Sequence, residues 1–197
     1  DVQNWILQKS GTFDNQAAQD AASTLQDWNN KGYMPEGVNA VDASTALSRF
    51  CNGEGLFFPS GNWNLDTVAK ALGDDVQFFA FPGATSEDEP NVAANAGAFY
   101  GIPVNAKNRD AAAAFLDYTQ SAEAQQIIVD NSGYLPKSST LDLKANSALQ
   151  QSMFDAYADV LTSGHTSDFI NNATAGMQSS GLIPNFQLLL DNSITPQ

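Results

Sequence analysis

Cysteine and histidine are almost absent from this chain of 197 residues. Cys51 is the only cysteine, so neither a disulfide within the chain nor a cysteine cluster for a metal can form. Its spacing from Leu47 and Phe50 predicts a buried packing residue. His165 is the only histidine, which excludes a His-rich metal site and makes any Ser–His or Cys–His catalytic proposal depend on that one residue.

Basic residues are also scarce. The chain has eight Lys and Arg residues but 22 Asp and Glu residues, and its formal net charge is -14. Nucleic acid and anionic membrane surfaces are therefore poor partners, whereas neutral or cationic ligands remain possible. Solubility is the simpler explanation of the acidity.

Long apolar runs are missing, so no transmembrane helix is predicted. The first residues, Asp1-Val2-Gln3-Asn4, have neither a basic region nor an apolar segment, so no signal peptide is expected, although a mature or excised chain would begin in the same way. A hydrophobic content of 43% and a charged content of 15% predict a globular chain, either one large domain or parts of two.

Familiar catalytic signatures are lacking as well. The chain has no phosphate loop, dinucleotide glycine motif, zinc-protease helix or Gly-x-Ser-x-Gly elbow. None of the 22 acidic residues stands out as an acid–base pair at a strand end. We therefore predict no catalysis, no cofactor and no metal.

Helical periodicity covers most of what is present. The first clear helix is expected from Asp14, its predicted N-cap, to Lys31, with Trp28 as a core anchor. The other predicted helices follow Asp42 or Ser44, span residues 65–72, follow Asn108, follow Ser121, carry Leu149 to Val160, begin near Ser167, and begin near Pro184.

Two short strands are expected among these helices, at Leu56–Phe58 and Val76–Phe81. The first leads into the corner Gly61-Asn62-Trp63-Asn64. A Trp ring between two amides suits a sugar, because the ring can stack on the apolar sugar face while the amides bind its hydroxyls. The simpler interpretation is a core Trp beside an N-cap formed by Asn64, and on this stretch alone that interpretation is favoured.

A second stretch, residues 93–103, combines small residues with Phe99 and Tyr100. Small residues let a backbone approach a ligand closely, although an ordinary loop entering a strand would look the same. At the other end of the chain, Thr195-Pro196 is a helix-start signal, so the sequence is expected to be part of a longer protein.

Six stretches in order carry a resemblance to one family. They are residues 25–33, 50–57 with Gly61-Asn62-Trp63, 79–83, 97–103, 105–125 (Asn105-Ala106-Lys107-Asn108 through Ser121-Ala122-Glu123-Ala124-Gln125), and Gly133-Tyr134-Leu135-Pro136. Together they resemble the extracellular solute-binding proteins of bacterial ABC importers, in the branch of the maltose/maltodextrin-binding protein.

The resemblance implies an α/β, periplasmic-binding-protein-like (type II) fold of two lobes, here mainly the second lobe and incomplete. Residues 1–95 would form a second-lobe segment with the Gly-Asn-Trp corner. Residues 96–144 would form a hinge crossing with first-lobe helices, and 145–197 a return to the second lobe without its final helix. It also implies an extracellular protein, a cell-surface lipoprotein or periplasmic, and a monomer whose partners are a carbohydrate and the membrane permease of an ABC importer.

The family's ligand contacts carry over to particular positions. Trp63 matches the sugar-stacking Trp of a Gly-x-Trp motif, with Asn62 and Asn64 beside it. Gly97, Ala98 and Phe99 match a glycine-led segment that lines the cleft, and Tyr100 follows them, although strand alternation puts Phe99 and Tyr100 on opposite faces. Asp168, like His165 and Met177, lies where the family often adds contacts, while Tyr134 is expected only to pack.

Other functions remain open. The same fold could bind a polyamine, a peptide or a metal chelate, which the acidic charge would allow. A glycoside hydrolase fragment is a further alternative, since two carboxylates distant in sequence suffice for that chemistry. The amides and aromatics at the loop corners favour an oligosaccharide that is bound and not turned over.

Overall fold

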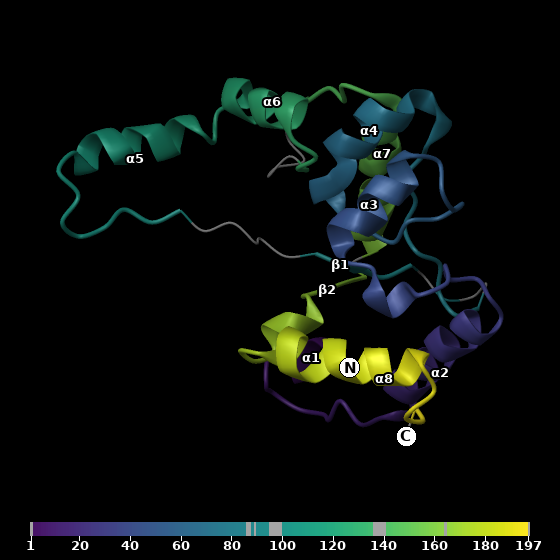
Figure 1. The fold of residues 1–197 in the computed structure, drawn as a ribbon. Coiled ribbons are helices and arrows are strands. Elements are labelled where there is room, and N and C mark those ends of the chain that lie inside the picture. Colours follow the sequence, from purple (N-terminus) through teal and green to yellow (C-terminus); the bar gives the residue numbers. More distant parts are fainter. Residues whose placement is uncertain are drawn as a thin grey trace. The chain divides into compact units, whose positions relative to one another are not determined.

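The chain folds into two compact units in a computed structural model that describes residues 2–85, 88, 90–94, 100–135, 141–163 and 165–196. Unit 1 comprises residues 1–43, 93–95 and 166–197, and unit 2 comprises residues 44–92 and 96–165 (Figure 1). The units are groups of contacting residues, so the lobe assigned to each of the segments 1–95, 96–144 and 145–197 stays a prediction.

Helices dominate both units. Unit 1 holds α1 (Val2–Ile6), α2 (Gln16–Asn30), the 3-10 turns η1 (Val38–Ala40) and η4 (Ile170–Asn172), the π-helix η5 (Met177–Leu182) and α8 (Ile183–Leu190). Unit 2 holds α3 (Ala43–Cys51, whose first residue belongs to unit 1), η2 (Asn62–Asn64), α4 (Leu65–Leu72), η3 (Gly73–Asp75), α5 (Arg109–Tyr118), α6 (Ala122–Asn131) and α7 (Ala148–Ser163). These positions confirm the predicted helices except the one expected near Ser167.

The helix expected near Ser167 is wrong. Strand β2 (Thr166–Ser167) lies there, followed by η4, and a π-helix starts only at Met177. Gly176 separates them with a φ of 78°, a left-handed conformation that ends a right-handed helix. The cap of α2 also differs from the prediction, because Asn15 and not Asp14 accepts the N–H of Ala18, at 3.1 Å.

Within unit 1, side-chain amides connect the helices by hydrogen bonds to backbone carbonyls at the ends of other elements. Gln26 and Asn29 on α2 donate to the carbonyl oxygens of Leu189 and Leu190, at 2.8 and 2.7 Å. The last carbonyls of a helix have no partner within it, so these two amides from one face of α2 complete the end of α8. In the same way, Gln8 donates to the carbonyl of Ala173 at 2.8 Å.

The core of unit 2 lies between α4 and α7, which run beside each other in Figure 1. Leu65 and Val68 from α4 meet Leu149 and Met153 from α7, and each buried side chain of this size stabilises the fold by about 1.5–3 kcal/mol. Cys51 packs against this core from α3, half-buried, in the packing role predicted for it. Gly73 ends α4 as expected, with a φ of 56°.

The two predicted strands are wrong. Leu56 is 88% and Phe57 73% exposed, so the first segment is not buried, and neither segment is part of a sheet. A strand needs a partner ladder for its backbone groups. Among the described residues, the segment at 76–81 is held by a side chain instead, since the N–H of Phe78 donates to Ser152 Oγ on α7 at 2.8 Å.

The strands that do form in the described part of the chain are two residues long. β1 (Val92–Ala93) pairs with β2 through the N–H groups of Val92 and Ala94, which donate to the carbonyls of His165 and Ser167 at 3.2 and 2.8 Å. The described residues are thus mostly helical and show little of the sheet of an α/β protein. None of the helices formed by these residues has both the length and the apolar character needed to cross a membrane.

Candidate functional site

The corner Gly61–Asn64 stands at the start of α4 in unit 2. Gly61 is extended, with a φ of -125°, and the next three residues form the single turn η2. The N–H of Asn64 donates to the carbonyl of Gly61 at 3.2 Å. Leu65 follows at once and is buried in the core, so the apolar face of α4 fixes where the polar corner is displayed.

Trp63 is displayed at this corner and is 58% exposed. It is therefore not the core Trp of the simpler interpretation. Its indole lies across the backbone of Gly61, because a Cβ added to Gly61 would overlap the six-membered part of the ring. The glycine before the turn thus makes room for the ring, which rests with one side on the chain and keeps more than half of its surface accessible.

The two amides of the corner have different surroundings. Asn62, the first residue of η2, is half-buried. Asn64 occupies the cap position of α4, but its side chain makes no cap bond and its Nδ2 donates to Ser60 Oγ at 2.9 Å. The N-cap role expected for Asn64 in the simpler interpretation is therefore wrong, and Ser60 is a polar neighbour that the sequence did not single out.

Gly133 lies directly against the corner, although it is distant in sequence. It is buried, and a Cβ added to it would overlap the carbonyl oxygen of Asn62 and come within 2.8 Å of Leu65 Cβ. Tyr134 comes next and is 55% exposed. The corner and the Gly-Tyr pair after α6 are thus neighbours in unit 2, which sequence spacing alone could not reveal.

The described residues of the corner and of the start of α4 carry little net charge. The residues of the corner are neutral, and the nearest acid along α4, Asp66, forms an ion pair with Lys70 at 2.6 Å. In the described residues, no three His, Cys, Asp or Glu side chains gather as a metal site would require. An exposed aromatic ring beside amide and hydroxyl groups is suited to a neutral, hydroxylated ligand.

The other predicted contacts stay predictions. Gly97, Ala98 and Phe99 lie outside the described residues, and Tyr100 is exposed. Asp168 belongs to unit 1, where its Oδ1 accepts the N–H of Phe169 at 2.7 Å and the Nδ2 of Asn172 at 2.8 Å. Those bonds give its carboxylate a local structural role at the start of η4, and its ligand role stays a prediction.

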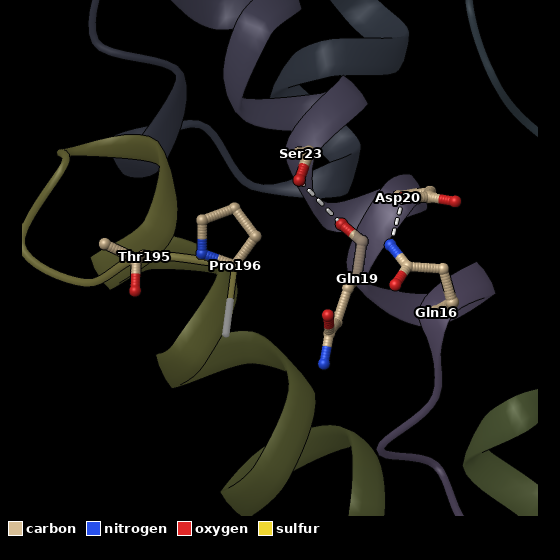
Figure 2. A pocket seen from close by; sticks show the side chains of 6 residues that line it. All are labelled: Gln16, Gln19, Asp20, Ser23, Thr195 and Pro196. Carbon is tan, nitrogen blue, oxygen red and sulfur yellow. Dashed lines mark hydrogen bonds between the residues drawn. The ribbon is translucent and has the colours of Figure 1, made fainter.

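A hollow in unit 1 offers different chemistry. Gln16, Gln19, Asp20 and Ser23 on α2 and Thr195 and Pro196 line it (Figure 2). Its polar groups already bond within α2, since Gln16 Nε2 donates to Asp20 Oδ1 at 2.7 Å and Ser23 Oγ to the carbonyl of Gln19 at 2.8 Å. With no aromatic ring in its lining, this hollow is less suited to a sugar than the corner.

Comparison with known proteins assigns the chain to a family. The sequence model of the bacterial extracellular solute-binding proteins matches residues 3–154, which is more than half of the chain. The chain belongs to this family. The match includes the corner and the Gly133–Tyr134 pair but ends before Asp168. A search of curated proteins found no match.

Membership gives this solute-binding protein its general role. It binds a solute outside the cytoplasm for import by an ABC transporter, with a small molecule as ligand and a permease as partner. Proteins of this family typically perform no catalysis, and the family suggests a periplasmic-binding-protein-like fold, with which the mostly helical units are compatible as part of a domain. The resemblance identified in the sequence is thereby confirmed for the family.

Proposed function

We propose that the solute is a carbohydrate, specifically an oligosaccharide, and that Trp63 stacks on one of its rings. The observation that carries this proposal is the exposed indole of Trp63, supported from below by Gly61 and flanked by amides. Stacking contributes on the order of 1 kcal/mol beyond area burial. The amides supply the directional bonds that distinguish one arrangement of hydroxyls from another.

Neutrality at the corner supports a sugar over a polyamine. A cationic ligand would require acids that face it, and Asp66, the nearest acid of α4, is paired with Lys70. We also propose that the whole protein has the type II two-lobe architecture and acts as a monomeric lipoprotein or periplasmic protein that delivers its ligand to the permease. Asn62, Asn64, Gly97, Ala98, Phe99, Tyr100 and Asp168 are its further candidate contacts.

The test is calorimetric titration of the protein with maltotriose, cellotriose, xylotriose and spermidine. One trisaccharide should bind, and Trp63→Ala should weaken its binding by about fivefold or more. Tyr33→Ala removes another exposed aromatic side chain, in unit 1, and serves as the control that keeps affinity. Binding of spermidine alone would contradict the sugar, and release of product from an aryl glycoside panel would indicate a hydrolase.

A further inference from the structure

We infer that Tyr134 is a second aromatic contact of the ligand that stacks on Trp63, held in place by the contact between Gly133 and Asn62. This inference rests on the proposed sugar-binding function and assigns a residue for which the sequence indicated only packing. Three observations lead to it: the closeness of the two backbones, the exposure of both rings, and the bonds that fix the loop after α6.

The backbones of the two segments touch. Gly133 is buried against Asn62 and Leu65, and even a methyl group at position 133 would overlap the Asn62 carbonyl. Trp63 and Tyr134 each directly follow one of the two touching residues, about 3.8 Å along the chain from it. The starting points of the two side chains are therefore close, at a distance set by a contact that leaves no room for adjustment.

Both rings remain accessible at this junction. Trp63 is 58% and Tyr134 55% exposed, whereas the residues that join them, Gly133 and Leu65, are buried. Two accessible rings on a shared rigid base form the kind of aromatic surface on which successive sugar rings can rest, with the phenol hydroxyl available to a ligand hydroxyl.

The backbone that leads from α6 to Tyr134 is held by hydrogen bonds. Ser132 Oγ donates to the carbonyl of Ile128 at 2.6 Å and accepts the N–H of Tyr134 at 3.3 Å. Gln150, which is completely buried on α7, donates to the carbonyl of Val129 at 2.8 Å. The base of Tyr134 is thus set before a ligand arrives, which lowers the entropic cost of binding.

Proximity can be tested without a sugar. In a Cys51→Ala background, bimane is attached to a cysteine introduced by Tyr134→Cys, and its emission is compared with and without Trp63→Phe, since tryptophan quenches this label at short range. Emission should rise when Trp63 is replaced. A label introduced by Tyr118→Cys on α5 is the control that stays unchanged. An equally unchanged label at position 134 would overturn the inference.

Binding then tests the role. For the trisaccharide that the unaltered protein binds, Tyr134→Ala should weaken binding by about threefold to tenfold, and Tyr134→Phe should retain the stacking part of the affinity. Gly133→Ala should reduce binding as well, because the added methyl group would displace the turn that carries Trp63.

The outcomes separate the two proposals. If Trp63→Ala weakens binding and Tyr134→Ala leaves it unchanged, the inference is wrong and the sugar site stands. If no trisaccharide binds to the unaltered protein, the proposed function and the ligand assigned to Tyr134 both fail, and the bimane result still decides whether the two side chains are neighbours.

Discussion

Gln150 donates a hydrogen bond from Nε2 to the carbonyl oxygen of Val129 at 2.8 Å, and both residues are fully buried, with 0% exposure. The bond completes the end of α6, where the last carbonyls have no partner within the helix. Asn146 assists by donating to the carbonyl of Asp130 at 2.8 Å, while its own N–H is accepted by Gln150 Oε1 at 2.7 Å. Gln150 on α7 thus binds the end of α6 through Nε2 and the segment before α7 through Oε1.

Gln150→Leu should therefore destabilise unit 2. The apolar side chain keeps most of the volume but leaves the buried carbonyl of Val129 without this donor, which costs about 1–3 kcal/mol in the free energy of unfolding. Gln151→Leu is the matched control, because Gln151 is exposed and bonds only to Asp155 on the same helix among its described partners. Urea unfolding measures both variants, and equal losses would contradict the role given to Gln150.

The core between α4 and α7 gives a second prediction. Met153 has 0% exposure and contacts the buried Leu65, Val68 and Leu149 cluster. Met153→Ala should lower the free energy of unfolding by about 2–5 kcal/mol, since it removes buried methylenes and leaves a cavity. Ile127→Ala, on the half-exposed face of α6, should cost far less. Thermal unfolding of the two variants measures these losses. A larger loss for Ile127→Ala than for Met153→Ala would show that the core is assigned wrongly.

The stability should also fall in alkali because of Tyr157. Burial raises the pKa of Tyr157 above its ordinary value of 10.0, so the folded state favours the neutral phenol. The corresponding stability is complete below pH 10 and is lost as the pH rises through the higher folded-state pKa. Tyr157→Phe should reduce this alkaline loss in urea titrations at increasing pH.

One further group affects this pH experiment equally in all variants. Lys31, whose pKa is raised by its hydrogen bond to Asp27 and by the charge of that carboxylate, contributes the same alkaline dependence to all variants. An alkaline loss that is undiminished in Tyr157→Phe would show that the phenol is not responsible.

The segments that failed to form strands give a fourth prediction. Phe57 and Phe79 contact each other edge to face, with ring centroids 6.1 Å apart, and both are exposed. Such an apolar surface binds hydrophobic dyes and favours association. Replacing both by Thr should lower the fluorescence of bound anilinonaphthalene sulfonate. Phe115→Thr alters an exposed residue on α5 and should retain the part of the dye fluorescence that depends on Phe57 and Phe79.

The sequence predicted helices well because their signals are local. Apolar spacing and Ser121, which caps α6 by accepting the N–H of Ala124 at 3.2 Å, depend on residues within one turn. Strands depend on a distant partner, so the apolar runs at 56–58 and 76–81 predicted sheets that the described residues do not form. The identity of Trp63 as the ligand candidate came from a short motif, and its exposure agrees with a role at the surface.

What sequence spacing could not supply was the neighbour of that motif. About seventy positions of chain separate Asn62 from Gly133, and only the folded chain brings the two backbones together. The ligand contact suggested by the position of Asp168 stays a prediction, and the structure adds the local bonds of its carboxylate to Phe169 and Asn172.

The contact between Gly133 and Asn62 restricts how this protein can change by mutation. Every amino acid except glycine would place its Cβ into the Asn62 carbonyl. Substitution at position 133 is therefore not tolerated as long as the turn keeps its present backbone conformation. A lineage that replaced this glycine would first have to rebuild the turn around Trp63. The corner Gly61–Asn64 and residues 132–135 after α6 are therefore expected to evolve as a pair.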